Sequence, residues 1–217
     1  MTKDINLKNR VFTSLILLLL VFLISKFTYF LVYILILLGV ICIIEFLNLI
    51  NKIKLNKINF FISNFFFIIY IFILCLLFFY LSTFIQFKVI IFSLLLCCVA
   101  SDIGGYVFGK LFKGPKLTKV SPNKTLSGAF GSLICSGIFF STIIFIFTFN
   151  FSYKVLLIGI FTSIACQLGD LFFSYLKRKA KIKDTGNILP GHGGLLDRVD
   201  GILLGLPIGF FASILLF

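Results

Sequence analysis

The chain has 217 residues, of which 60% are hydrophobic and only 12% are charged, and its mean hydropathy is +1.18. Soluble domains carry roughly 25% charged residues, so this composition excludes a soluble enzyme, and its hydrophobicity excludes a disordered chain. Twenty Lys and Arg against seven Asp and Glu give a formal net charge of +13. We therefore expect an all-α, polytopic integral membrane bundle.

Apolar runs divide the chain into candidate membrane spans, each of which needs about 17–25 residues to cross a bilayer as a helix. The first run follows basic residues but lacks a small-residue cleavage site, so we expect it to be retained as a helix. Lys26 separates it from the second run. We predict about seven transmembrane helices, over residues 11–25, 27–50, 60–80, 89–112, 126–150, 155–176 and 201–217.

The basic residues predict the orientation of these spans, because short cytoplasmic loops collect Lys and Arg. Seventeen of the 20 lie in the N-terminal segment and in segments 51–58, 110–124 and 177–198. The other three, Lys26, Lys88 and Lys154, fall singly in the alternate loops. Seven spans with a cytoplasmic N-terminus place all four basic segments on the cytoplasmic side.

Glycine spacing predicts close helix packing. Gly105 and Gly109 form one G-x-x-x-G pair, and Gly201, Gly205 and Gly209 form two in tandem. Small residues four apart on a membrane helix let a neighbouring helix approach closely. We expect the predicted helices 89–112 and 201–217 to pack through these faces.

Two of the seven acidic residues fall inside predicted spans, where a carboxylate costs at least about 2.5–3.5 kcal/mol and is a functional candidate by default. Asp102 lies in the span 89–112, and Asp170 in the span 155–176. Pairing with a neighbouring lysine as a packing device is the alternative. Glu45 lies near the end of its span, and we expect it to reach the cytoplasmic interface.

Polar residues continue from Asp170 toward the predicted cytoplasmic side. Ser174 and Lys177 follow Asp170 at helical spacing, so the three share one helix face, and Arg178 comes next. A glycine-rich loop with the sole histidine then leads into a helix that begins with two acids. The residues concerned are Gly191, His192, Gly193, Gly194, Asp197 and Asp200.

Such a set suits phosphoryl or nucleotidyl transfer. Carboxylates hold Mg²⁺ beside substrate phosphates, glycine-rich loops aim N–H groups at phosphate oxygens, and Lys and Arg spread the developing charge. A second polar and basic element, residues 116–128, precedes the fifth predicted span and lies on the same predicted side of the membrane. We therefore predict an N-terminal membrane region over 1–100 and a catalytic region over 101–217, with cytoplasmic loops 113–125 and 177–200.

The C-terminal segment also carries a longer pattern. Ser174-x-x-Lys177-Arg178 is followed by Lys183-Asp184-x-Gly186 and then by Pro190-Gly191-His192-Gly193-Gly194-x-x-Asp197-Arg198-x-Asp200. This pattern resembles the signature of the phosphatidate cytidylyltransferase family, also called CDP-diacylglycerol synthases. The resemblance extends to Gly169-Asp170-Leu171 and Ser121-Pro122-Asn123-Lys124-Thr125, and covers roughly residues 100–201. Asn123 stands where the family commonly has a second lysine.

The resemblance implies that CTP and phosphatidic acid give CDP-diacylglycerol and pyrophosphate, with Mg²⁺ and assistance from a monovalent cation such as K⁺. It implies a bacterial inner membrane protein with its active site on the cytoplasmic side. No nucleic acid is expected, because there is no soluble basic-aromatic platform; a homodimer is left open. Two alternatives remain: a CTP-dependent polyprenol or phytol kinase and, from a different class, a membrane anion transporter.

The resemblance also implies roles for individual residues. Asp170 and Asp197 are the first candidates for metal ligands, with Asp200 and Asp102 as further candidates. Polar contacts to substrate are expected from Ser121 and Ser174. His192 either structures its loop and bonds phosphate or transfers a proton, and Asp184 either organises the loop or accompanies Lys183. The residues expected to hold the phosphates of CTP and lipid are Lys124, Lys177, Arg178, Lys183 and Arg198.

Overall fold

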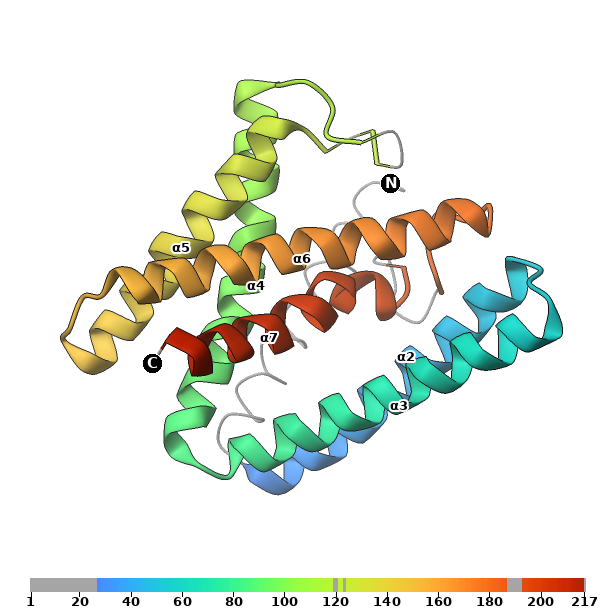
Figure 1. The fold of residues 1–217 in the computed structure, drawn as a ribbon, viewed down its shortest axis with the longest axis horizontal. Coiled ribbons are helices and arrows are strands. Elements are labelled where there is room, and N and C mark those ends of the chain that lie inside the picture. The colour runs from blue at the N-terminus through green and yellow to red at the C-terminus, as the bar shows by residue number, and fades with distance from the viewer. Residues whose placement is uncertain (1–26, 119–120, 123, 187–192, 217) are drawn as a thin grey trace, which may run out of the picture. The chain divides into compact units, whose positions relative to one another are not determined.

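The computed structural model describes residues 27–118, 121–122, 124–186 and 193–216. Within them the chain forms six long helices and no strand beyond an isolated bridge between Lys116 and Thr125, which confirms the all-α prediction (Figure 1). The first predicted span, 11–25, lies outside the described residues, so the count of seven and the cytoplasmic N-terminus remain predictions. The helices are α2 (Thr28–Lys52), α3 (Lys57–Ser82), α4 (Ile85–Phe112), α5 (Leu126–Thr148), α6 (Tyr153–Lys179) and α7 (Leu196–Leu216).

The ends of α4, α6 and α7 differ from the predicted ends. Helix α4 begins before Lys88, which is therefore helical, and α6 continues through Lys179. Helix α7 begins at Leu196, so the connection between α6 and α7 covers 180–195 rather than 177–200. Hydropathy marks where the apolar run stops, whereas backbone hydrogen bonds continue through lysines whose ammonium groups reach the interface.

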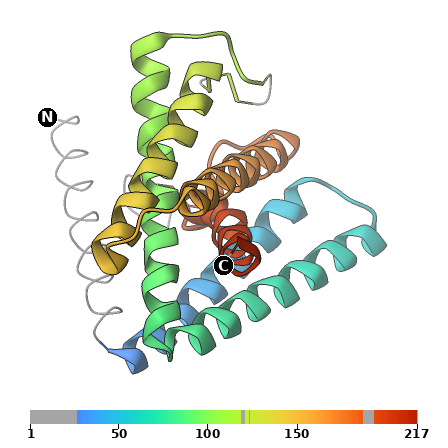
Figure 2. The same ribbon diagram turned by 60° about the vertical axis from the view of Figure 1, so that its left-hand side comes forward.

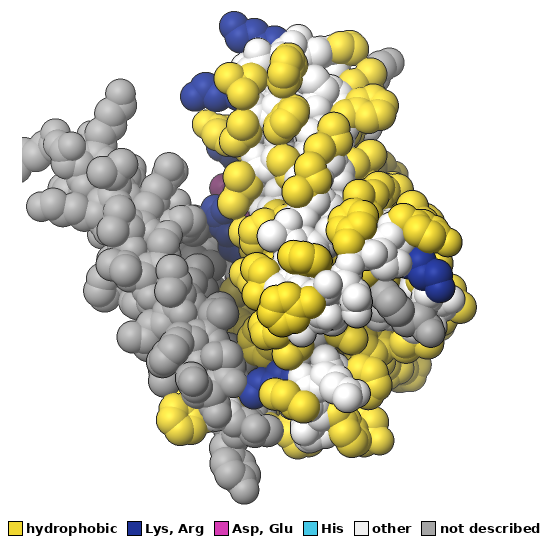
Figure 3. Space-filling view, turned by 90° about the vertical axis from the view of Figure 1, so that its left-hand side faces the viewer, with side chains coloured by type: hydrophobic (Ala, Val, Ile, Leu, Met, Phe, Trp, Pro, Cys, Tyr) yellow, Lys and Arg dark blue, Asp and Glu magenta, His cyan; other side chains and the backbone are white. Residues whose placement is uncertain are grey.

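All six described helices are long and apolar enough to cross a membrane. Their outward side chains are large and apolar, as the exposed Phe66, Phe72 and Phe130 illustrate. Figure 3 shows one such face, on which apolar side chains dominate and Lys and Arg lie in a few places. Exposed apolar surface on this scale marks a membrane contact, so the chain is an integral membrane protein.

The chain folds into two compact units, one of residues 27–84 with 176–198 and one of residues 85–175 with 199–216. In the first unit, α2 and α3 run side by side as a hairpin. Phe46 of α2 stacks on Phe67 of α3 with ring centroids 3.8 Å apart. The predicted division into an N-terminal membrane region (1–100) and a catalytic region (101–217) concerns function rather than packing, and it stays a prediction.

The second unit is held together by the glycine faces that the sequence predicted. Helices α4 and α5 lie side by side in Figures 1 and 2, so closely that a Cβ on Gly105 would lie 2.6 Å from Ser132 Oγ. Between α6 and α7, a Cβ on Gly205 would lie 2.6 Å from Cys166 Sγ, and one on Gly209 would lie 2.3 Å from Thr162 Oγ1. These contacts confirm close packing through both motifs.

Candidate active site

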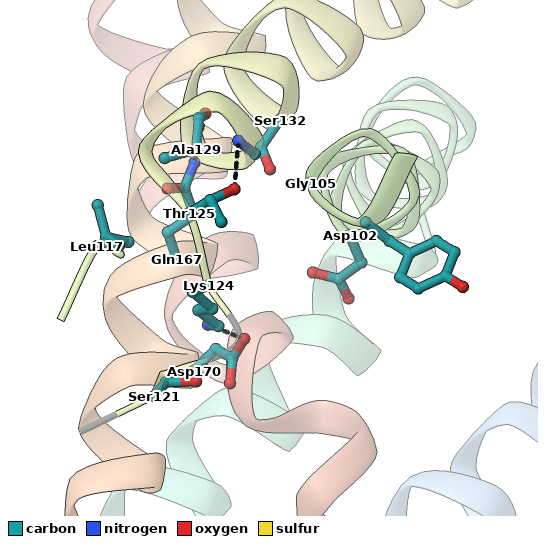
Figure 4. Close-up of a pocket in the computed structure, with 12 residues that line it drawn as sticks. Asp102, Gly105, Leu117, Ser121, Lys124, Thr125, Ala129, Ser132, Gln167 and Asp170 are labelled. Atoms are coloured by element: carbon teal, nitrogen blue, oxygen red, sulfur yellow. Dashed lines mark hydrogen bonds and ion pairs between the residues drawn. The ribbon is translucent and has the colours of Figure 1, made fainter. Parts of the chain in front are cut away.

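A pocket of about 340 Å³ opens in the second unit beside the start of α5. Helix α4, the 113–125 connection, α5 and α6 all contribute to its walls (Figure 4). Its lining includes two carboxylates and one ammonium group. The lining residues are Asp102, Gly105, Tyr106, Leu117, Ser121, Lys124, Thr125, Gly128, Ala129, Ser132, Gln167 and Asp170.

Lys124 and Asp170 form an ion pair in this pocket, with Lys124 Nζ donating to Asp170 Oδ2. The two side chains come from the 113–125 connection and from α6, 46 residues apart in sequence. Ser174, one turn along α6, lies 3.5 Å from Asp170 Oδ1. That contact confirms the prediction that Asp170 and Ser174 share a helix face.

Asp102 approaches the same pocket from α4, and Figure 4 shows its carboxylate directed toward the Lys124–Asp170 pair. The pocket thus collects two of the intramembrane acids and one of the predicted phosphate-binding lysines. Ser121 also lines it, held in its turn by accepting the Lys124 N–H at its carbonyl. Four of the predicted site residues therefore meet in this pocket.

The donor groups of the pocket fit Mg²⁺. Carboxylate, hydroxyl and amide oxygens are the ligands that Mg²⁺ takes, and it usually keeps several waters and substrate phosphate oxygens besides one or two carboxylates. Within the described residues, no three Asp, Glu, His or Cys side chains gather as a metal-binding group. Asp102 and Asp170 could hold such an ion only together with water and substrate.

The start of α5 borders the pocket and is capped by its own sequence. Thr125 has an extended backbone, and its hydroxyl accepts the N–H of Gly128 at 3.1 Å, as expected for a threonine at an N-cap. The positive end of the α5 dipole therefore lies beside Lys124. Both features favour an anionic ligand.

Asp197 lies in the first unit, in the first turn of α7. Lys177 Nζ donates to its Oδ1 at 2.8 Å, while the N–H groups of Thr185 and Gly194 donate to its Oδ2 at 2.8 and 3.1 Å. A carboxylate offers about four acceptor positions, so these three hydrogen bonds from described residues leave one for a metal or a ligand. Gly193 has a φ of +83°, a backbone conformation that favours glycine.

Most of the remaining predicted residues within the described chain belong to the first unit. Four charged members of the signature are exposed: Arg178, Lys183, Asp184 and Arg198. Asp200 is 8% exposed, and its Oδ1 accepts the N–H of Gly201 at 2.9 Å. His192 lies outside the described residues, so its proposed roles remain predictions.

The prediction that Glu45 reaches the cytoplasmic interface is wrong. Its side chain is only 2% exposed and accepts hydrogen bonds from Thr185, Leu195 and Leu196. Sequence reasoning also missed Thr185 and Gln167, whose amide donates to the carbonyl of Ala129 at 3.3 Å. A lone acid in an apolar run was the available signal for Glu45, since such acids are buried only with partners.

Comparison with known proteins agrees with the signature. The model of the cytidylyltransferase family matches residues 1–216. A phosphatidate cytidylyltransferase of Staphylococcus haemolyticus is 48% identical over 110 residues, which cover 50% of this chain and 42% of that protein. One of Rickettsia felis is 44% identical over 128 residues, which cover 54% and 56%.

A third relative, a phosphatidate cytidylyltransferase of Helicobacter pylori, is 43% identical over 124 residues, which cover 54% of this chain and 44% of that protein. The chain spans about half the length of the curated relatives it matches. The family model, by contrast, extends over nearly every residue of the chain. The chain belongs to the cytidylyltransferase family.

Proposed function

We propose that this protein transfers the cytidylyl group of CTP to phosphatidic acid and so makes CDP-diacylglycerol and pyrophosphate. The observation that carries the proposal is the Lys124–Asp170 pair facing Asp102 in one pocket of a membrane-embedded member of this family. The identified relatives are named phosphatidate cytidylyltransferases. A lipid substrate requires a site within a membrane protein, and an anionic nucleotide requires a site with a cation and with carboxylates that can hold a metal.

In the proposed reaction, a phosphate oxygen of phosphatidic acid attacks the α-phosphorus of CTP. A new P–O bond forms there, the bond from the α-phosphorus to the oxygen that bridges to the β-phosphate breaks, and pyrophosphate leaves. The attacking phosphate is already anionic near pH 7, so this step needs no strong general base. His192 would therefore serve its loop or bond a phosphate rather than accept the proton.

Lys124 and the start of α5 would bind substrate phosphate oxygens, and the charge of Lys124 would offset the negative charge that builds on the transferred group. Asp102 and Asp170 would hold Mg²⁺, with Ser121 and Ser174 as polar neighbours. A bound Mg²⁺ supplies charge neutralisation at the phosphates. A monovalent cation such as K⁺ would have a supporting role beside Mg²⁺ in this reaction.

Asp197 would be a further metal ligand, held in place by Lys177 and two backbone N–H groups. Asp200 remains a further candidate. The exposed cations of the signature, Arg178, Lys183 and Arg198, would attract the anionic substrates, and each surface cation adds about 1 kcal/mol of attraction to an anionic membrane. We place the active site on the cytoplasmic side of a bacterial inner membrane, where CTP is available.

Product analysis tests the proposal. Purified protein in detergent with phosphatidic acid, CTP and Mg²⁺ should release pyrophosphate and form a CDP-lipid, and chelation of Mg²⁺ should stop both. A polyprenol or phytol kinase would instead release CDP and phosphorylate an alcohol. An anion transporter would move substrate into liposomes without any covalent change. Either result would overturn the proposal, provided that a known synthase is active alongside.

A further inference from the structure

We propose that Glu45 is a positioning residue for Asp197: its carboxylate fixes the start of α7 and the preceding loop, and so holds Asp197 in the orientation in which it would bind a metal. The inference rests on the proposed function only in its effect on turnover. The contacts themselves all lie within the first unit. Glu45 belongs to α2, some 150 residues before the segment that it holds.

Glu45 binds the beginning of α7 directly. Its Oε1 accepts the N–H of Leu195 at 3.0 Å, and its Oε2 accepts the N–H of Leu196 at 2.8 Å. The first N–H groups of a helix have no partner within the helix, and a carboxylate is the favoured group there. Helix α7 therefore takes its N-terminal cap from a different helix.

Thr185 links Glu45 to Asp197. Its hydroxyl donates to Glu45 Oε2 at 2.8 Å, and its backbone N–H donates to Asp197 Oδ2 at 2.8 Å. Thr185 is itself buried, at 6% exposure. Any shift of Thr185 that follows the loss of Glu45 must therefore displace one of the hydrogen bonds that orient Asp197.

The surrounding chain leaves room for this carboxylate. A Cβ on Gly186 would lie 2.6 Å from Glu45 Oε1, and one on Gly194 would lie 2.5 Å from Glu45 Oε2 and 2.2 Å from Thr185 Oγ1. Gly194 also donates its N–H to Asp197. Glycines at both positions thus allow Glu45 and Asp197 to bind the same short loop.

Among the described residues, the three groups that hydrogen-bond to Glu45 are all donors, which explains the choice of a carboxylate over an amide. Glutamine has nearly the same shape, but one end of its amide is an NH₂ group that cannot accept a hydrogen bond. Glu45→Gln would therefore turn one of these contacts into a donor facing a donor. The substitution tests the contacts while it preserves side-chain volume.

The experiment compares Glu45→Gln, Thr185→Val and Thr185→Ser with the wild type in the full-length chain. Turnover, KM for phosphatidic acid, the Mg²⁺ concentration for half-maximal activity, and amide hydrogen exchange at Thr185 and Leu195–Asp197 are measured. We expect Glu45→Gln and Thr185→Val to lower kcat at least tenfold. We also expect a several-fold higher Mg²⁺ requirement, at least tenfold faster exchange at these amides and a KM for lipid within twofold of the wild type. Thr185→Ser, which keeps the hydroxyl, should behave as the wild type.

Phe67→Leu is the matched control, because it disturbs the stacking of Phe67 on Phe46, the residue next to Glu45 in sequence, and leaves the Glu45 carboxylate and its three hydrogen-bond donors in place. It should lower thermal stability and leave the Mg²⁺ requirement and the exchange at Leu195–Asp197 unchanged. The inference is overturned if Glu45→Gln matches the wild type, if it matches Phe67→Leu, or if exchange rises without a fall in kcat. A wild type that makes no CDP-lipid would refute the proposed function, and the exchange measurements would still decide whether Glu45 fixes the start of α7.

Discussion

Lys124 and Asp170 form an ion pair whose side chains remain 27% and 32% exposed. A carboxylate within an apolar span is costly and needs a compensating reason. The position of the pair in a pocket shared with Asp102 gives a functional reason. The ammonium group would turn to substrate phosphate and release the carboxylate to a metal.

Asp170→Asn should reduce turnover by at least 100-fold, because it removes a metal-binding charge and keeps the side-chain shape. Membrane insertion and thermal stability should change little, because the substitution loses one ion-pair partner but also removes a costly charge from an apolar span. Initial rates of CDP-lipid formation, measured beside melting curves in detergent, check this. Near-normal rates would show that Asp170 is no metal ligand.

Lys124→Met should raise KM for CTP or for phosphatidic acid at least tenfold and lower kcat as well, because it removes the only cation lining the 340 Å³ pocket among the described residues. Lys124→Arg should retain part of the activity, since it keeps the charge but changes the geometry of its donors. Steady-state kinetics over both substrates provide the comparison. Equal activity of Lys124→Met and the wild type would contradict the assignment.

Asp197→Asn should abolish turnover and also lower stability, unlike Asp170→Asn. Asp197 is paired with Lys177 at 2.8 Å, and its side chain is only 9% exposed. Hydrogen bonds to charged groups contribute about 1.5–3 kcal/mol, and the substitution weakens three of them. A melting temperature lower than that of Asp170→Asn, with both variants inserted, would support the distinction; identical melting curves would argue against it.

Gly205→Val should destabilise the protein without touching any proposed ligand. Even a Cβ at this position would lie 2.6 Å from Cys166 Sγ and 3.0 Å from Cys98 Sγ, and overpacking of this kind costs about 1–3 kcal/mol. Gly137→Ala is the control, because the nearest atom to a Cβ at that position would be Cγ1 of the flexible Ile160 side chain, 3.3 Å away. Thermal unfolding in detergent should separate the two variants, and equal midpoints would show that the α6–α7 contact tolerates bulk.

Much of the fold could be predicted from the sequence, because long apolar runs indicate membrane helices and the spacing of glycines indicates where those helices pack. The faces of Gly105 and Gly205 were predicted in this way and are present. The ends of the helices were harder to predict. Leu196 starts α7 because Glu45, a residue of α2, binds its N–H, and no local pattern records a cap that comes from another helix.

The candidate site was likewise predictable only in part. Asp102 and Asp170 were predictable, because a carboxylate inside an apolar span is costly enough to need a reason. The pairing of Asp170 with Lys124, and that of Asp197 with Lys177, depends on how distant segments fold back. Glu45 carried the same signal as Asp102, but its nearness to the end of a span suggested solvent rather than burial.

Label transfer from CTP tests the proposed cytidylyl transfer most directly. Wild-type protein in detergent, given phosphatidic acid and Mg²⁺, is supplied in parallel with CTP labelled at the α- or the γ-phosphate. We predict that the α-label enters the lipid fraction while the γ-label leaves entirely as pyrophosphate, and that Asp170→Asn transfers neither label. Entry of the γ-label into lipid, or no labelled lipid from intact wild type while a known synthase is active, would contradict cytidylyl transfer by this protein.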